Sequence, residues 1–142
     1  MTPYDEHLRD CRSLHQPRPP ISIPTLEAAG LVLATDVHAV APFPAFVASA
    51  MDGYAVQVAD VPGRLQVIGD LPAGREPDVT VRPGTAVRIM TGSAVPLGAE
   101  AVIPVEEVHR AGDWIETTTA TTIGRHIRGV GEDVAPGDLV LD

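Results

Sequence analysis

Proline and glycine interrupt this chain so often that it cannot fold as a bundle of long helices. The 142 residues include 13 Gly and 14 Pro, and both residue types break helices and mark turns. Apolar runs alternate with these turn signals at intervals of roughly 8–12 residues, a spacing typical of a small β-barrel or β-sandwich. We predict strands at residues 21–23, 31–41, 55–58, 65–68, 79–81, 86–90, 101–108, 114–119 and 139–141.

The N-terminal segment departs from this pattern. Thr2 is suited to cap a helix, and Tyr4, Leu8 and Cys11 fall on one face of it. We expect Cys11 to be a buried or half-buried thiol rather than a nucleophile. A second, brief helix is predicted over residues 24–30. Helices gathered at the start of the chain and strands after them indicate the α+β class.

Charge and apolar patterning limit the classes of function. Nineteen Asp and Glu face ten cationic residues, all of them Arg, for a net charge of −9. This balance argues against non-specific nucleic-acid binding, but it permits a small phosphorylated ligand held by local Arg side chains and backbone amides. No apolar run approaches the roughly 20 residues of a membrane span, and the N-terminus lacks signal-peptide features. We therefore expect a soluble, cytoplasmic protein.

The first candidate site is the stretch Ser-Ala-Met-Asp-Gly at residues 49–53. It lies between a proline-stiffened loop and a strand. Gly53 adopts turn conformations at low cost and would point the Asp52 carboxylate from the end of a strand. Such a carboxylate suits a ligand or metal contact. The alternative is an ordinary turn Asp that bonds its own backbone.

The second candidate site follows the strand predicted to end at Met90. Thr91, Gly92 and Ser93 combine two hydroxyls with exposed amides, which can form an anion-binding nest. The stretch lacks the Lys and the glycine spacing of a P-loop. A hairpin connection without ligand chemistry explains the same residues.

The third candidate site covers residues 124–133. Arg125 and Arg128 flank His126, and guanidinium forks suit phosphate or molybdate-like oxyanions. Glu132 and Asp133 could supply carboxylate oxygens to Mg²⁺. Because adjacent side chains of a strand point to opposite faces, one of the two carboxylates at most faces a given site, and the spacing does not settle which. The alternative is a surface loop with local ion pairs, each contributing less than about 1 kcal/mol.

Together these stretches resemble the N-terminal half of molybdopterin molybdenumtransferase, the MoeA and gephyrin E-domain family of molybdenum cofactor biosynthesis. The resemblance rests on residues 49–56, on residues 88–92 with Pro96-x-Gly98-Ala99, and on Ile127-Arg128-x-x-Gly131-Glu132-Asp133. The three motifs occur in the family's order, and the resemblance extends over nearly the whole chain.

The resemblance implies an elongated α+β molecule. A mixed α/β dimerisation domain would be formed by both chain ends, residues 1–47 and 124–142. An inserted β-rich, barrel-like domain would span residues 48–123. Family members form homodimers with the cleft between subunits, so this chain would supply the partner-side wall of that cleft. A molybdopterin adenylyltransferase domain or protein is a further implied partner.

The resemblance also implies a transferase reaction. Family members insert molybdate into adenylylated molybdopterin, with Mg²⁺, and release AMP. By motif match, the catalytic positions that line the cleft are Asp52, Thr91 and Asp133, so the resemblance chooses between the two adjacent carboxylates. Substrate binding falls to Ser49, Gly92, Ser93 and Arg128, and no metal ligand is assigned.

Two departures from the family pattern affect what this chain is expected to do. Val47-Ala48 stand where family members often carry Asp-Asn, and the sequence ends at Asp142, before the larger α/β domain that holds most molybdopterin-binding residues in the family. We expect either a fragment of the enzyme that is inactive alone, or a stand-alone dimerisation and binding module. An unrelated small β-barrel that binds sugars or nucleotides is the remaining alternative.

Overall fold

The computed structural model describes residues 3–14 and 18–142, which form two compact units. The first unit comprises the described residues up to Asp36 together with Asp142, and the second spans residues 37–141. None of the described helices is long and apolar enough to cross a lipid bilayer.

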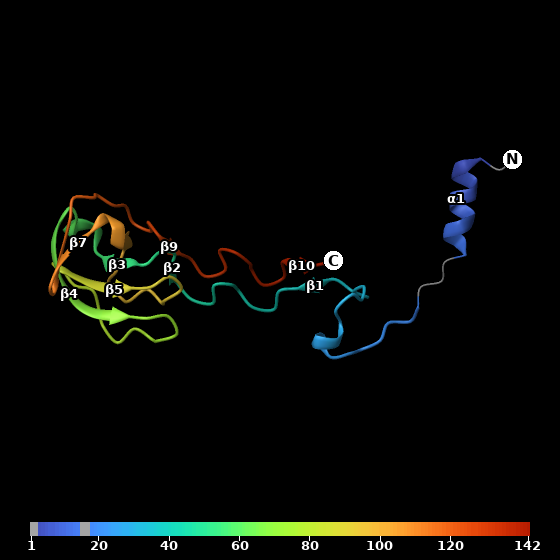
Figure 1. Cartoon of the computed structure of the whole chain (residues 1–142), viewed down its shortest axis with the longest axis horizontal. Coiled ribbons are helices and arrows are strands. Elements are labelled where there is room, and N and C mark those ends of the chain that lie inside the picture. Colours follow the sequence, from blue (N-terminus) through green and yellow to red (C-terminus); the bar gives the residue numbers. More distant parts are fainter. Residues whose placement is uncertain (1–2, 15–17) are drawn as a thin grey trace. The chain divides into compact units, whose positions relative to one another are not determined.

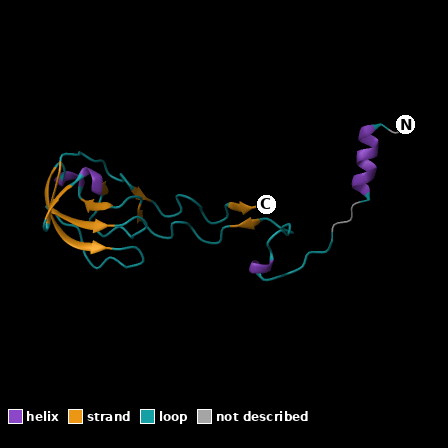
Figure 2. Cartoon of the chain, viewed as in Figure 1, coloured by secondary structure: helices purple, strands orange, loops and turns teal. Residues whose placement is uncertain are grey.

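The first unit contains one α-helix and one turn of 3₁₀ helix, shown in Figure 2. Helix α1 spans Tyr4–Ser13 with Pro3 as its N-cap, and η1 spans Thr25–Glu27. The predicted cap Thr2 lies outside the described residues. No residue of α1 is buried, so the predicted buried or half-buried position of Cys11 is wrong and its thiol is exposed.

Of two strands predicted near the N-terminus, one is absent and the other is much shorter than predicted. Residues 21–23 form no strand, and of residues 31–41 only Val37–His38 (β1) is a strand. Alternating apolar residues make a strand only where a second strand pairs with them. Prolines 20 and 24 flank the first segment and remove backbone donors that a ladder needs.

The second unit is built on a curled, half-barrel sheet of six strands (Figure 1). Their order is β6-β3-β5-β4-β8-β7, and every neighbouring pair is antiparallel except β4 and β5. The strands are β3 (Gly53–Val56), β4 (Gly63–Leu71), β5 (Thr85–Ile89), β6 (Ala101–Pro104), β7 (His109–Ala111) and β8 (Trp114–Thr117). Short 3₁₀ turns, η2 (Val58–Asp60) and η3 (Val105–Glu107), follow β3 and β6.

The sheet buries apolar side chains on both faces. Successive residues of β3 point to opposite sides, so Tyr54 and Val56 enter one core cluster and Ala55 enters the other. The first cluster also contains Leu65, Ile103 and Ile115, and the second contains Leu71, Val87, Ile89 and Val102. Strands β3 and β6 are buried along their whole length.

Three predicted strands differ from the structure. Residues 79–81 form no strand, although Val81 is buried in the core and donates its N–H to Leu97. The strand predicted over 101–108 ends at Pro104, and β8 ends at Thr117. Proline lacks the N–H that would continue the ladder, so η3 replaces the last part of the predicted strand.

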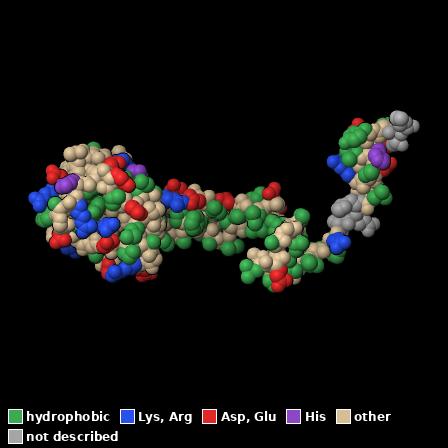
Figure 3. Space-filling model, viewed as in Figure 1, with side chains coloured by type: hydrophobic (Ala, Val, Ile, Leu, Met, Phe, Trp, Pro, Cys, Tyr) green, Lys and Arg blue, Asp and Glu red, His purple; other side chains and the backbone are tan. Residues whose placement is uncertain are grey.

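Two segments that flank the half-barrel in sequence pair with one another as a ribbon. We call residues 37–49 and 127–141 the ribbon. At one end of the ribbon β1 pairs with β10 (Leu139–Leu141). At the other end β2 (Ala48–Ser49) pairs with β9 (Ile127–Arg128). Between these pairs, Phe43 donates its N–H to Val134 at 2.8 Å. Hydrophobic side chains are exposed along the ribbon (Figure 3), Val40 at 96% and Phe43 at 61%.

The mixed helix-and-sheet class with a barrel-like sheet is confirmed. The boundary between the two compact units falls between residues 36 and 37, whereas the sequence predicts interleaved domains with boundaries at 47/48 and 123/124. That interleaved division stays a prediction.

Close packing of β3 against β6 makes a specific demand on residue 53. A Cβ added at Gly53 would meet the Ile103 carbonyl oxygen and would come within 2.9 Å of the Ile103 carbonyl carbon and of Val102 Cγ1. We predict that Gly53→Ala lowers the free energy of unfolding by about 1–3 kcal/mol, as overpacking does. Urea unfolding followed by the fluorescence of the single Trp114 measures this change.

Gly129→Ala is the matched control for this prediction. A Cβ there would meet only the Glu132 carboxylate at 3.8 Å, so the change should stay within about 0.5 kcal/mol, as for most surface substitutions. Equal effects of the two substitutions would show that the β3–β6 contact is not the cause.

Candidate functional site

Asp52 is bound to Thr91 by two hydrogen bonds that converge on one carboxylate oxygen. The Thr91 N–H and hydroxyl donate to Asp52 Oδ1 at 2.7 and 2.8 Å. The two residues are 39 positions apart in sequence. Asp52 therefore does not act as an ordinary turn Asp that bonds its own backbone, and that alternative is wrong.

The pairing of β3 with β5 explains how these two residues meet. Gly53, the first residue of β3, lies opposite Ile89, the last residue of β5. Asp52 directly precedes Gly53, and Thr91 follows Ile89 by two residues. The Asp52 carbonyl also accepts a bond from the Val105 N–H at 3.1 Å, so both its main chain and its side chain are held.

Hydrogen bonding keeps Asp52 ionised. The Thr91 N–H lowers the pKa of the Asp52 carboxyl below its ordinary value of 3.8, and the Thr91 hydroxyl lowers it further. Desolvation acts in the opposite direction, and the positive charge of Arg88 makes the smallest contribution, which lowers the pKa. Among the described residues, no group donates a hydrogen bond to the second oxygen, Asp52 Oδ2. The site thus presents a carboxylate with one oxygen fixed and one oxygen available.

Ser49 and Ser93 are buried and hold the loops around Asp52 together. The Ser49 hydroxyl donates to the Met51 carbonyl at 2.6 Å, and the Ser93 hydroxyl donates to the Leu71 carbonyl at 3.0 Å. The Ser49 N–H donates to the Ser93 carbonyl at 2.9 Å. Both side chains are 1% exposed or less. Both hydroxyls are thus bonded inside the protein. Their assignment as direct substrate contacts stays a prediction.

The loop after β5 does not form a free anion-binding nest. The N–H of Thr91 donates to Asp52, that of Gly92 to the Ser49 carbonyl at 2.9 Å, and that of Ser93 to the Met90 carbonyl at 3.0 Å. All three amides are thus bonded within the chain. Strands β5 and β6 each pair with β3 and not with one another, so the loop between them is not the hairpin of the alternative either. Thr91 is the residue of this loop that contacts Asp52. Substrate binding by Gly92 stays a prediction.

The third candidate stretch lies on the ribbon and carries its own ion pair. Arg128 of β9 donates to the Asp133 carboxylate, and Glu132 accepts a bond from the Gly129 N–H at 2.7 Å. Asp133 also donates its N–H to the Phe43 carbonyl at 3.0 Å. These contacts close the turn after β9.

The structure brings Asp52 and Thr91 together but leaves Asp133 in a separate cluster. Ser49, three residues before Asp52, pairs with Ile127, next to Arg128. Within residues 3–14 and 18–142, however, no hydrogen bond or ion pair joins the Asp52–Thr91 pair to the Arg128–Asp133 pair. The catalytic role of Asp133 and the substrate-binding role of Arg128 stay predictions.

Arg125 has a structural partner that the sequence did not reveal. Its guanidinium makes a two-pronged contact with Glu107 of η3, at 2.8 and 3.3 Å. The spacing of Arg125 and Arg128 around a His suggested a pair of oxyanion forks, whereas each fork is bonded to a carboxylate of the chain. Nothing in the local sequence identifies Glu107, 18 residues away, as the partner.

Sequence reasoning also missed Asp70 and the part played by Arg88. Arg88 NH1 lies 3.7 Å from Asp70 Oδ2 on the neighbouring strand. Arg88 comes three residues before Thr91, and the alternation of β5 is the only sequence signal for its position.

His126 has a left-handed backbone conformation, with a φ of 57°. Its backbone carbonyl accepts a hydrogen bond from the Ala50 N–H at 2.9 Å.

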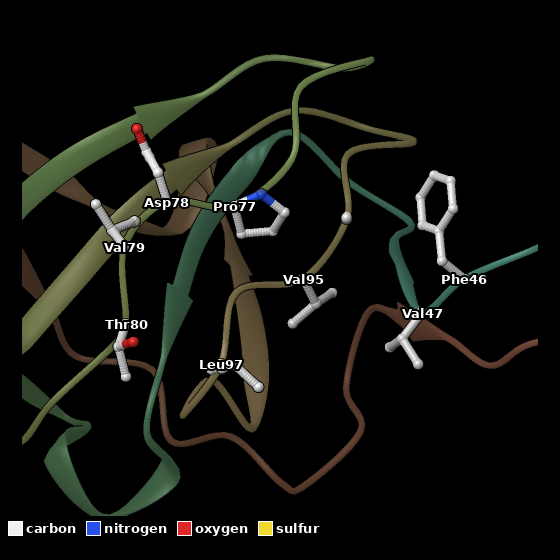
Figure 4. A pocket seen from close by; sticks show the side chains of 9 residues that line it. Phe46, Val47, Pro77, Asp78, Val79, Thr80, Val95 and Leu97 are labelled. Carbon is white, nitrogen blue, oxygen red and sulfur yellow. The ribbon is translucent and has the colours of Figure 1, made fainter.

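An open groove lies beside β2 rather than at Asp52 (Figure 4). Its volume is about 440 Å³, and its apolar wall is formed by Phe46, Val47, Val79, Val95 and Leu97. Val47, one of the two residues that depart from the family pattern, lines this groove. Its neighbour Ala48 is buried and pairs with Arg128.

The described residues do not build a metal site by themselves. No group of three or more His, Cys, Asp or Glu side chains among them is arranged to hold a metal ion. Asp133 is paired with Arg128, and Glu132 is bonded to a backbone N–H. Asp52 Oδ2 accepts no hydrogen bond from the described residues.

The chain matches a known protein family over nearly its whole length. A family profile described as the MoeA N-terminal region (domain I and II) matches residues 2–142. This chain belongs to the MoeA N-terminal family. The resemblance drawn from the three motifs is thereby confirmed.

Two curated members of the MoeA family illustrate the similarity. The chain is 44% identical over 148 residues to molybdopterin molybdenumtransferase 2 of Mycobacterium tuberculosis, covering 99% of this chain and 36% of the relative. It is 30% identical over 162 residues to gephyrin of Dictyostelium discoideum, covering 100% of this chain and 22% of the relative. The chain therefore spans about a third or less of the length of these relatives.

A solved structure supports the fold. The chain is similar to the crystal structure of the molybdopterin biosynthesis MoeA protein of Pyrococcus horikoshii OT3, with a TM-score of 0.78 and 39% identity. The match covers 84% of this chain and 33% of that protein. Members of the MoeA N-terminal family thus share the architecture that carries the Asp52–Thr91 pair in this chain.

The lowered pKa of Asp52 predicts a pH-dependent contribution to stability. A carboxyl whose pKa is depressed in the folded state stabilises the fold above its unfolded pKa, and the contribution is lost as the pH falls through the folded value. The difference in unfolding free energy between wild type and Asp52→Asn should therefore be largest near neutral pH and should shrink in acid. Urea titrations across this pH range measure the difference.

Thr91→Val serves as the matched variant. It removes the hydroxyl donor but keeps the N–H. We therefore expect Thr91→Val to lose less unfolding free energy between neutral and acid pH than wild type does, and more than Asp52→Asn does. A wild-type advantage over Asp52→Asn that does not change with pH would contradict the account of the Asp52 carboxylate.

Proposed function

We propose that this chain is the N-terminal region of the molybdenum cofactor enzyme that inserts molybdate into adenylylated molybdopterin with release of AMP. The observation that carries the proposal is the ionised Asp52 carboxylate, held by Thr91 at the strand ends of a half-barrel in a MoeA N-terminal chain. The proposed role of the chain is to supply the partner-side wall of the reaction cleft, in the cytoplasm.

Asp52 and Thr91 act as one unit in this proposal. Two donors fix Oδ1, so the carboxylate cannot rotate freely and Oδ2 keeps a defined direction. A fixed, ionised oxygen can accept a proton or can hold a cation that accompanies an anionic substrate. Thr91 is therefore the orienting partner and Asp52 the reacting group.

Magnesium fits this site only in combination with a substrate. Mg²⁺ is commonly bound by one or two carboxylates together with substrate phosphates and water. Asp52 Oδ2 would supply one such ligand, and the phosphate oxygens of adenylylated molybdopterin would supply others. Bound there, the ion would neutralise phosphate charge. This chain alone would then be inactive, because it offers too few ligands for substrate and metal.

The remaining assigned residues support the site at a distance in this proposal. Ser49 and Ser93 fix the loops on either side of Asp52. Asp133 and Arg128 lie on the ribbon as a charged pair. In a homodimer, these ribbon residues would complete the cleft through contacts that the single chain does not make.

The exposed apolar side chains of the ribbon support the proposed homodimer. A two-stranded ribbon alone is marginally stable in water, and its exposed residues include Val40, Phe43, Val130 and Leu139. The same observation favours the alternative function, a stand-alone dimerisation and binding module without catalysis. A molybdopterin adenylyltransferase is a further proposed partner in either case.

A chimeric enzyme tests the proposed function. This chain would replace the corresponding N-terminal region of the Mycobacterium tuberculosis molybdopterin molybdenumtransferase 2, and molybdenum cofactor formation would be measured in a bacterium that lacks its own molybdenumtransferase. We predict that the chimera restores cofactor formation. Asp52→Asn should reduce it at least tenfold, because loss of a reacting group typically costs about 10²–10⁴-fold in rate.

Asp78→Asn is the matched control in the chimera. Asp78 is an exposed carboxylate that accepts a bond from Arg75 in the loop between the parallel strands β4 and β5, so its loss should leave cofactor formation unchanged. A chimera that works equally well with Asp52→Asn would exclude the catalytic role and would leave the binding-module alternative.

A further inference from the structure

The connection between β4 and β5 contains a strand-like segment that has no pairing partner. Residues 76–82, which we call the edge segment, form no helix, turn or strand, and Figure 4 shows part of them beside the groove. Their burial nevertheless alternates strictly. Pro77, Val79 and Val81 are half-buried or buried, and the residues between and beside them are exposed. This alternation is that of an extended strand with one face on a core.

One edge of the edge segment faces the protein. The Val81 N–H donates to the Leu97 carbonyl at 2.8 Å, and the side chains of Val79 and Val81 both belong to the second core cluster or pack against it. In an extended chain, the N–H groups of every second residue point to the same edge. The N–H groups of Asp78 and Thr80 therefore point to the edge opposite Leu97.

That opposite edge is free of backbone pairing. Among the described residues, the backbone N–H and C=O groups of Asp78 and Thr80 make no hydrogen bond, and both residues are exposed. A row of unpaired N–H and C=O groups is a template for a strand from another chain. The missing partner also explains why the strand predicted at residues 79–81 does not form in the single chain.

The two ends of the edge segment carry opposite charges that have no partner in the chain. Glu76 and Arg82 are both exposed and lie three residues before and after Val79. Within the described residues, neither side chain takes part in an ion pair. When two copies pair antiparallel with Val79 opposite Val79, Glu76 of one copy faces Arg82 of the partner subunit, and the two-fold symmetry repeats this ion pair at the other end.

The same register uses the free backbone groups. Opposite residues of an antiparallel ladder alternate between pairs that exchange both N–H···O bonds and pairs that exchange none. With Val79 on the two-fold axis, Asp78 lies opposite Thr80 of the partner subunit, and these free groups exchange both bonds. Pro77 lies opposite Val81 of the partner subunit in a pair that exchanges none, where the missing proline N–H costs nothing.

We propose that the edge segment is a self-association surface, which pairs antiparallel with the edge segment of a second copy of this chain. Charge favours a second copy as the occupant. Residues 75–82 carry two Arg, one Glu and one Asp and are neutral in sum, whereas the whole chain carries a net charge of −9. The paired segments thus attract one another at a place where the acidic surface does not repel a like copy. This surface is separate from the ribbon and goes beyond the proposed function.

Charge reversal tests the pairing in the 142-residue chain. Sedimentation equilibrium would compare wild type with Glu76→Arg and with Arg82→Glu. Each substitution places like charges opposite one another at both ends of the paired segments, so the association constant should fall about tenfold or more. An equimolar mixture of the two variants should regain the wild-type association, because a segment with two Arg then faces a segment with two Glu.

Glu106→Arg is the matched control. Glu106 is an exposed residue of η3, and its reversal changes the net charge as much as Glu76→Arg does, so this variant should associate like wild type. A mixture of Glu76→Arg and Arg82→Glu that associates no better than either variant alone would overturn the proposal. Equal association of all variants would assign the contact to the ribbon and would overturn it as well.

Amide hydrogen exchange provides a second measurement that does not depend on substitutions. As the wild-type concentration rises, exchange at the Asp78 and Thr80 amides should slow, while exchange at the Val79 amide should not change. Exchange at Asp78 and Thr80 that is independent of concentration would count against the pairing. A ribbon dimer does not involve these amides, so failure of the homodimer in the proposed function would leave both measurements able to decide.

Discussion

The double hydrogen bond from Thr91 to Asp52 is the contact on which the candidate site depends. It joins the start of β3 to the loop after β5, and the antiparallel pairing of these strands places the two residues side by side. Around it, buried Ser49 and Ser93 fix the adjoining loops through bonds to backbone carbonyls. The site is therefore built on strand ends rather than on a free loop, which limits how far the carboxylate can move.

A second strand pairing, between β2 and β9, connects the site to the ribbon. Ser49 pairs with Ile127, and the Ala50 N–H donates to the carbonyl of His126, which has a positive φ. The segment that leads into Asp52 is therefore hydrogen-bonded to residues 126 and 127.

Much of the sheet could be predicted from apolar alternation and turn residues, but pairing partners could not. The strand after Asp52 and the strand before Thr91 follow from local pattern, whereas their mutual contact spans 39 positions. Arg125 illustrates the limit, since its spacing suggested an oxyanion fork and its partner is Glu107. Residues 21–23 alternate like a strand but have no strand to pair with. Local propensity therefore predicts a strand here that the structure does not contain.

The candidate site depends on the bond from the Thr91 N–H to an ionised Asp52 carboxylate. An amide proton bonded to a titrating carboxylate changes its chemical shift as that carboxylate gains a proton. The decisive measurement is therefore the Thr91 amide proton shift through an acid titration of the chain. We predict a shift with the same midpoint as the Asp52 carboxyl, absent in Asp52→Asn. A Thr91 amide proton that does not respond to pH in wild type would contradict the claim.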